Sequence, residues 1–159
     1  MLGQGLISAV DVSYLADTVI ALRYFEAARD LMGTDYYDHP WLRSVPAFVI
    51  GSTLPDFDAE ECVMTYGDAG RSYASHGPTH ILYRLAAEYQ NPHAQWLARE
   101  MDRRSVGRGD YCTWANLLWY DPRVPMEPIS SLPTLTSGVM PGAMNLTALS
   151  IKFVRHWPR

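Results

Sequence analysis

The sequence predicts an all-α fold built from antiparallel helical hairpins. Apolar residues recur at helical spacing in five segments of the chain. A proline or a capping residue stands at the start of most of these segments, and one of the breaks between them is only a residue or two long. The 159 residues are 48% hydrophobic and 12% aromatic, which is enough to build one core.

The first predicted helix runs from Asp11 to Met32. Its apolar rhythm includes Val19, Leu22 and Phe25, and Gly33 stands where a C-terminal cap belongs. Because the apolar surface is wide, we expect an inner helix that is covered on more than one side.

The second predicted helix opens at His39-Pro40, because proline is favoured at the first helical position. Pro46 is expected to limit or kink it. Residues 51–77 then contain several glycines and no sustained period, which indicates a long connection of the kind that often carries function.

Three further helices are predicted downstream. Pro78 begins the third, which continues to Tyr89. Asn91-Pro92 supplies an N-cap and a proline for the fourth, which ends in Arg103 and Arg104. Asp110 is expected to cap a fifth helix that Pro122 ends.

Beyond residue 121, recurrent prolines interrupt every possible helix, so we expect an irregular Pro-rich tail. The predicted organisation is a helical domain at 1–121, followed at 122–159 by a Pro-rich linker and the remnant of a β-domain. Helical hairpins of this kind fit part of an (α/α) toroid and a helical bundle equally well on physical grounds alone.

Charge and hydropathy exclude several classes of partner. The net charge is −4 and the basic residues are scattered, except for Arg103, Arg104 and Arg108, so no nucleic-acid partner is expected. The longest apolar runs are too short to span a membrane. The N-terminus does not resemble a secretory signal, which predicts a cytoplasmic protein if the chain is complete. Cys62 and Cys112 are expected to be two ordinary buried thiols.

Several strings, in order along the chain, resemble landmarks of heparinase II/III-like and oligo-alginate-lyase-like proteins. They lie at 11–14, 21–35, 38–43, 65–70, 82–89, 91–97, 117–122 and 131–133. The resemblance implies a partial (α/α) toroid followed by a β-sandwich, an acidic polysaccharide or oligosaccharide as the partner, and a periplasmic or secreted location. It also implies β-elimination on glycans that contain uronic acid.

Such an elimination needs a base, a group that neutralises the enolate-like charge, and an acid for the leaving oxygen. The resemblance assigns the catalytic tyrosine to Tyr14. It places the assisting Asn and His on a helix that would lie before Met1, and a further His in the sandwich. We therefore expect a fragment of a polysaccharide lyase that is inactive alone. The alternatives are a noncatalytic helical module that binds a glycan or a partner, and a purely structural helical domain.

Arg71 and Tyr73, together with Arg84, are candidates for contacting a substrate carboxylate, since guanidinium matches carboxylate geometry and aromatic rings stack on sugars. Surface charge and core packing are the competing interpretation. His76 is a further substrate-binding candidate, because it ends the long connection that faces the cleft in the family.

No metal site and no cofactor are expected. His76 and His80 have the spacing of a zinc pair, but Gly77 and Pro78 separate them and the zinc-protease glutamate is absent. The four acidic residues at 56–61 lack the pattern of a calcium loop. No phosphate-loop string and no Gly-x-Ser-x-Gly string occur. Four tryptophans are expected to fill the core: Trp41, Trp96, Trp114 and Trp119.

Overall fold

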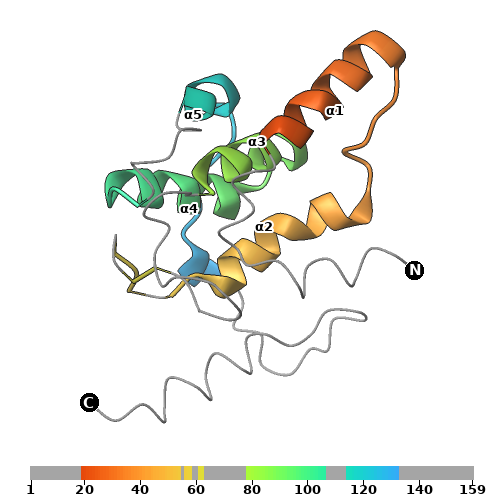
Figure 1. The fold of residues 1–159 in the computed structure, drawn as a ribbon. Helices are drawn as coiled ribbons and strands as arrows, with labels where there is room; N and C mark the ends of the chain where they lie inside the picture. Colours follow the sequence, from red (N-terminus) through yellow and green to blue (C-terminus); the bar gives the residue numbers. More distant parts are fainter. Residues whose placement is uncertain (1–18, 55, 59–60, 63–77, 107–113, 133–159) are drawn as a thin grey trace.

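The computed structural model describes residues 19–54, 56–58, 61–62, 78–106 and 114–132. Within these ranges the chain forms helices and no β-strand, so the all-α prediction is confirmed (Figure 1). The elements are α1 (Val19–Met32), α2 (Pro40–Ser52), α3 (Thr79–Tyr89), α4 (Pro92–Arg103), α5 (Trp114–Trp119) and the short 3-10 helix η2 (Ile129–Ser131). None of the described helices is long and apolar enough to cross a membrane.

Helix α3 lies at the centre of the molecule and packs against α2, α4 and α5. It is buried on nearly every side, and its most deeply buried apolar residues include Leu82, Leu85 and Ala86. Burying a leucine side chain contributes about 1.5–3 kcal/mol. Much of the core stability is therefore expected to come from this helix and its contacts.

The connection between α3 and α4 follows the prediction closely. Gln90 adopts a left-handed conformation with φ of 52°, and the Asn91 N–H donates to the Ala86 carbonyl at 3.0 Å. The Asn91 side chain accepts from the Ala94 N–H at 3.0 Å, and Pro92 occupies the first helical position. Capping residues within the connection thus determine where α3 ends and where α4 begins.

Helix α2 begins as predicted, with the His39 ring accepting from the Trp41 N–H at 3.2 Å. Of the two effects expected of Pro46, the ending of the helix does not occur, because α2 continues to Ser52 and passes the point where the long connection was predicted to begin. An internal proline costs about 3 kcal/mol, whereas each large apolar residue that is buried contributes about 1.5–3 kcal/mol. Val45 and Val49 are both buried, so packing outweighs the local penalty.

Helix α1 lies at the edge of the molecule in Figure 1. Gly33 ends it with φ of 66°, as the sequence indicates. Its predicted beginning at Asp11 lies outside the described residues. An inner helix was expected, yet Ile20 is 76% exposed and Tyr24 is 57% exposed. The described part of the chain therefore covers α1 on one side.

After α5 the chain returns to α4. The Asp121 carbonyl accepts from Gln95 Nε2 at 2.8 Å, and the Glu127 N–H donates to the Pro92 carbonyl at 3.2 Å. Val124 is buried. The first part of the predicted Pro-rich segment thus packs on the helical body, and residues 133–159 lie outside the described ranges.

Candidate functional site

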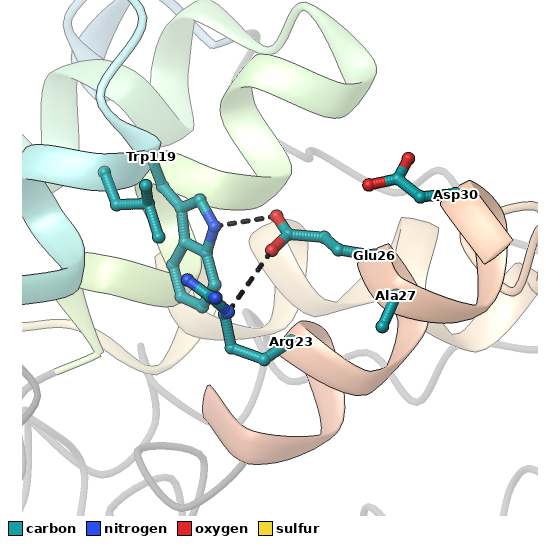
Figure 2. A pocket seen from close by; sticks show the side chains of 6 residues that line it. Arg23, Glu26, Ala27, Asp30 and Trp119 are labelled. Atoms are coloured by element: carbon teal, nitrogen blue, oxygen red, sulfur yellow. Dashed lines mark hydrogen bonds and ion pairs between the residues drawn. The ribbon is translucent and has the colours of Figure 1, made fainter.

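A shallow groove lies where α1 meets α3 and α5. Two adjoining hollows, of about 370 and 460 Å³, share three lining residues: Glu26, Leu118 and Trp119. Arg23 and Asp30 line the α1 side, and Arg84 and Arg123 help to line the other end. The groove is thus lined by both charged and apolar side chains, and Figure 2 shows its α1 end.

Glu26 is the centre of this groove. Its Oε1 accepts from Trp119 Nε1 at 2.7 Å and from Arg84 Nε at 2.8 Å. Arg23 approaches Oε2 at 3.7 Å (Figure 2). One carboxylate thus connects α1 with α3 and α5, and bonds to a charged partner are about twice as strong as neutral ones.

The ionic contacts continue behind the groove. Arg84 also pairs with Glu88 at 2.9 Å, and Arg29 reaches the same carboxylate at 2.9 Å. Both guanidinium groups lie over the Tyr37 ring, 4.2 Å from its centre for Arg84 and 4.5 Å for Arg29. We call Glu26, Arg29, Tyr37, Arg84, Glu88 and Trp119 the Glu26 network.

Burial sets the proton affinity of the tyrosine in this network. Tyr37 is 1% exposed, and burial raises its pKa to about 12, partly offset by Arg84. Its hydroxyl donates to the Leu22 carbonyl at 3.2 Å. At neutral pH Tyr37 is therefore a neutral group that ties α1 to the chain that follows it.

A second polar cluster lies inside the helical body. Tyr83 donates to Asp102 Oδ2 at 2.6 Å, and Asn116 Nδ2 contacts Asp102 Oδ1 at 3.2 Å and Thr79 Oγ1 at 3.1 Å. Burial and the neighbouring Asp102 carboxylate raise the pKa of Tyr83 well above its ordinary value. With its ring 1% exposed, Tyr83 is poorly suited to take a proton from a substrate.

All four residues predicted from the sequence to form the site lie outside the described residues. They are Tyr14, Arg71, Tyr73 and His76. The structure therefore neither brings them together nor separates them.

Arg84, the other arginine considered for a substrate carboxylate, is committed elsewhere. Its side chain is 11% exposed and its guanidinium is paired with Glu26 and Glu88. Simple surface charge therefore does not describe it. Arg84 instead holds α1 against α3.

Of the two histidines with the spacing of a zinc pair, His76 lies outside the described residues and His80 lies in α3. His80 is fully buried, and its ring stacks on Trp119 with 6.3 Å between ring centres. No group of three metal-binding side chains occurs among the residues that the structure describes. Asp56, Asp58 and Glu61 of the acidic segment are exposed, as expected for a solvated loop.

The tryptophan prediction is mostly correct. Trp119 is buried, and Trp41 and Trp96 pack against the core. The prediction is wrong for Trp114, which is 53% exposed at the first position of α5. The thiol of Cys62 is buried, as expected, whereas Cys112 lies outside the described part of the chain.

Sequence reasoning missed Glu26, because no motif in the chain distinguishes it. The i, i+4 spacing of Arg84 and Glu88 is a readable signal for an ion pair on one helix. No comparable signal connects Glu26 to partners that are 58 and 93 positions away.

The groove offers hydrogen-bonding and ionic side chains together with apolar surface from Leu118 and the indole of Trp119. Two of its carboxylates already have partners: Glu26 accepts from Arg84 and Trp119, and Asp121 pairs with Arg123 at 2.8 Å. The third, Asp30, is exposed at the α1 end of the groove. No protein-family profile matches the chain, and no curated protein or solved structure matches it either.

Proposed function

We propose that this chain supplies the helical part, of (α/α)-toroid type, of a heparinase II/III-like polysaccharide lyase and that it cleaves no glycan alone. The substrate class is an acidic polysaccharide or oligosaccharide that contains uronic acid. The proposal extends to a periplasmic or secreted location, where the resembling proteins work.

The observation that carries the proposal is the position of the resembling strings in the fold. Glu26 and Arg29 belong to 21–35, Arg84 and Glu88 to 82–89, and Trp119 to 117–122. In the structure these residues pair with one another. Strings that are individually short thus supply one connected network, which is expected of landmarks that define a single helical domain.

Part of the support for the proposed lack of activity comes from the two tyrosines of the polar clusters. Tyr37 and Tyr83 are each 1% exposed with raised pKa values, so neither is an accessible base. The resemblance assigns catalysis to Tyr14 and carries no assisting Asn or His to a neighbouring position. A tyrosine without partners that stabilise its phenolate or the enolate gains little rate.

Binding and turnover are measured on the same protein. We expect saturable binding of uronic-acid oligosaccharides by calorimetry, weaker binding of neutral oligosaccharides of equal length, and no rise in ultraviolet absorbance from unsaturated uronate. Arg71→Ala should weaken binding, whereas Arg43→Ala, which changes an exposed arginine paired with Asp38, serves as the matched control. Equal affinity for neutral and acidic glycans, or no binding of either, would contradict the proposal.

Turnover has its own control. If unsaturated product does form, Tyr14→Phe should abolish it while binding persists. That result would keep the lyase class and refute the proposed inactivity of the isolated chain. Product formation that survives Tyr14→Phe would refute the assignment of Tyr14.

A noncatalytic module that binds a protein partner is the second candidate. It is favoured by large apolar side chains that face solvent, such as Leu31 at 84% and Leu117 at 90% exposure. This candidate predicts association with protein in the absence of any glycan binding.

A further inference from the structure

One face of α1 carries a regular row of exposed side chains. Ile20 is 76% exposed, Tyr24 57% and Leu31 84%, and Ala27 is also exposed. The spacings of 4, 3 and 4 residues are those of the a and d positions of a heptad. We call these four residues the α1 seam.

Two charged residues flank the seam on the same side of the helix. Arg23 and Asp30 are seven positions apart and both line the groove beside the seam, as Figure 2 shows for their place on α1. Arg23 is about half exposed and lies 3.7 Å from Glu26, and the structure shows no pairing of Asp30 with any described residue. The two flanking charges have opposite sign.

We propose that the α1 seam is a docking surface for a second copy of this chain, with the two α1 helices packed antiparallel about a two-fold axis. In that register Ile20 lies opposite Leu31 of the second copy, and Tyr24 lies opposite Ala27. The two central layers then each pair a large side chain with a small one, which allows close packing, and the two outer layers each pair an isoleucine with a leucine. A parallel register would place each side chain opposite itself, with tyrosine against tyrosine.

Charge complementarity favours the same arrangement. In an antiparallel pair the g positions of the two helices face each other, so Arg23 of each copy meets Asp30 of the other. The two-fold axis makes this contact twice. In a parallel pair Arg23 faces the position of Ala28, and no such ion pair forms.

The seam is short, so the dimer is weak. The 14 residues of α1 extend about 21 Å, and a contact of four layers falls among interfaces below ~1,200 Å², which belong to transient complexes. Association is therefore measured by sedimentation equilibrium at protein concentrations up to about 1 mM.

Charge reversal provides the central test. Arg23→Asp and Asp30→Arg each replace two attractive contacts with two repulsive ones, and each should weaken self-association by about tenfold. The double variant R23D/D30R should restore it. When the two single variants are mixed, both flanking contacts of the heterodimer join an aspartate of one copy to an arginine of the other. The heterodimer should therefore form more tightly than either homodimer, and mixing without this gain would overturn the antiparallel register.

The apolar part of the seam has its own matched pair. Leu31→Glu should abolish association, whereas Leu117→Glu, on the equally exposed Leu117 of α5, should leave it unchanged. Circular dichroism confirms that each variant is folded. A wild-type chain that is monomeric at every concentration would overturn the proposal, because the α1 seam would then not bind a second copy of the chain. If Leu31→Glu and Leu117→Glu weaken self-association equally, the proposal is overturned, because the association would then be nonspecific contact between exposed apolar side chains.

Discussion

Replacing Glu26 with alanine tests the view that one carboxylate holds α1 against the helical body. The substitution removes the acceptor for Trp119 Nε1, at 2.7 Å, and for Arg84 Nε, at 2.8 Å. A hydrogen bond to a charged group contributes about 1.5–3 kcal/mol. Glu26 is 27% exposed and Arg84 keeps Glu88, so we expect a loss of about 2–3 kcal/mol rather than the sum of both bonds.

The assay is equilibrium unfolding in urea followed by circular dichroism, with the slope compared between proteins to confirm that the same surface unfolds. Glu26→Gln keeps an acceptor and the shape of the side chain but removes the charge, and we expect it to cost about half as much. Asp38→Ala is the matched control, because Asp38 pairs with Arg43 at 2.9 Å in an exposed position. We expect that control to cost no more than about 0.5 kcal/mol.

A double-mutant cycle identifies the bond responsible. Glu26→Ala combined with Trp119→Phe should show a coupling of about 1 kcal/mol, because the two side chains are in direct contact. If Glu26→Ala costs no more than Asp38→Ala, or if the coupling with Trp119 is zero, the reasoning about the Glu26 network is refuted.

Three further predictions concern stability. The pKa of Tyr37 is raised from 10.0 to about 12, so its contribution is complete below pH 10 and is lost as the pH rises toward 12. Tyr37→Phe should flatten the alkaline fall of the unfolding free energy, and an unchanged slope would contradict this. Asn91→Ala should cost about 1 kcal/mol in urea unfolding, because the Ala94 N–H loses its cap. Gln90→Gly should stabilise by about 0.5 kcal/mol, since φ is 52° there, whereas Gln90→Ala should show no such gain in the same assay.

The parts of the fold that the sequence predicts correctly are those with local causes. The α3–α4 connection depends on Asn91, Pro92 and a left-handed residue between the helices, all within a few positions. The C-terminal end of α1 depends on Gly33 and on the residue that follows it, whose backbone N–H groups donate to the carbonyls of Arg29 and Ala28. Capping geometry is a property of neighbouring residues, so a single sequence is enough to predict it.

The features that the sequence predicts wrongly depend on distant partners. Helix α2 continues beyond Pro46 because Val49 is buried in the core, which forms only when the other helices pack against α2. Trp114 has the same helical spacing as the buried tryptophans but lies on the outer side of α5. Periodicity reports that a side chain is apolar, and the packing of other helices decides whether it is covered.

The candidate site divides in the same way. Of the proposed lyase residues, Tyr14 and His76 are inferred from the resemblance, and Arg71 and Tyr73 from the chemistry of their side chains. All four lie outside the described part of the chain. The groove depends on the hydrogen bonds of Glu26 with Arg84 and Trp119, which are 58 and 93 positions away in the sequence. A periodic pattern within one segment cannot predict contacts between residues so far apart.

The polar attachment of α1 has a consequence for the order in which the molecule opens. Helix α3 is held by deeply buried apolar side chains, whereas α1 buries three residues and is joined largely through Glu26 and Arg29. Ionic contacts near the surface weaken as salt shortens the screening length to about 8 Å at physiological strength, and apolar burial does not. The backbone amides of α1 should therefore exchange with solvent faster than those of α3, and added salt should widen the difference. Such a helix behaves as a separate cooperative unit, which can detach while the remaining helices keep their core.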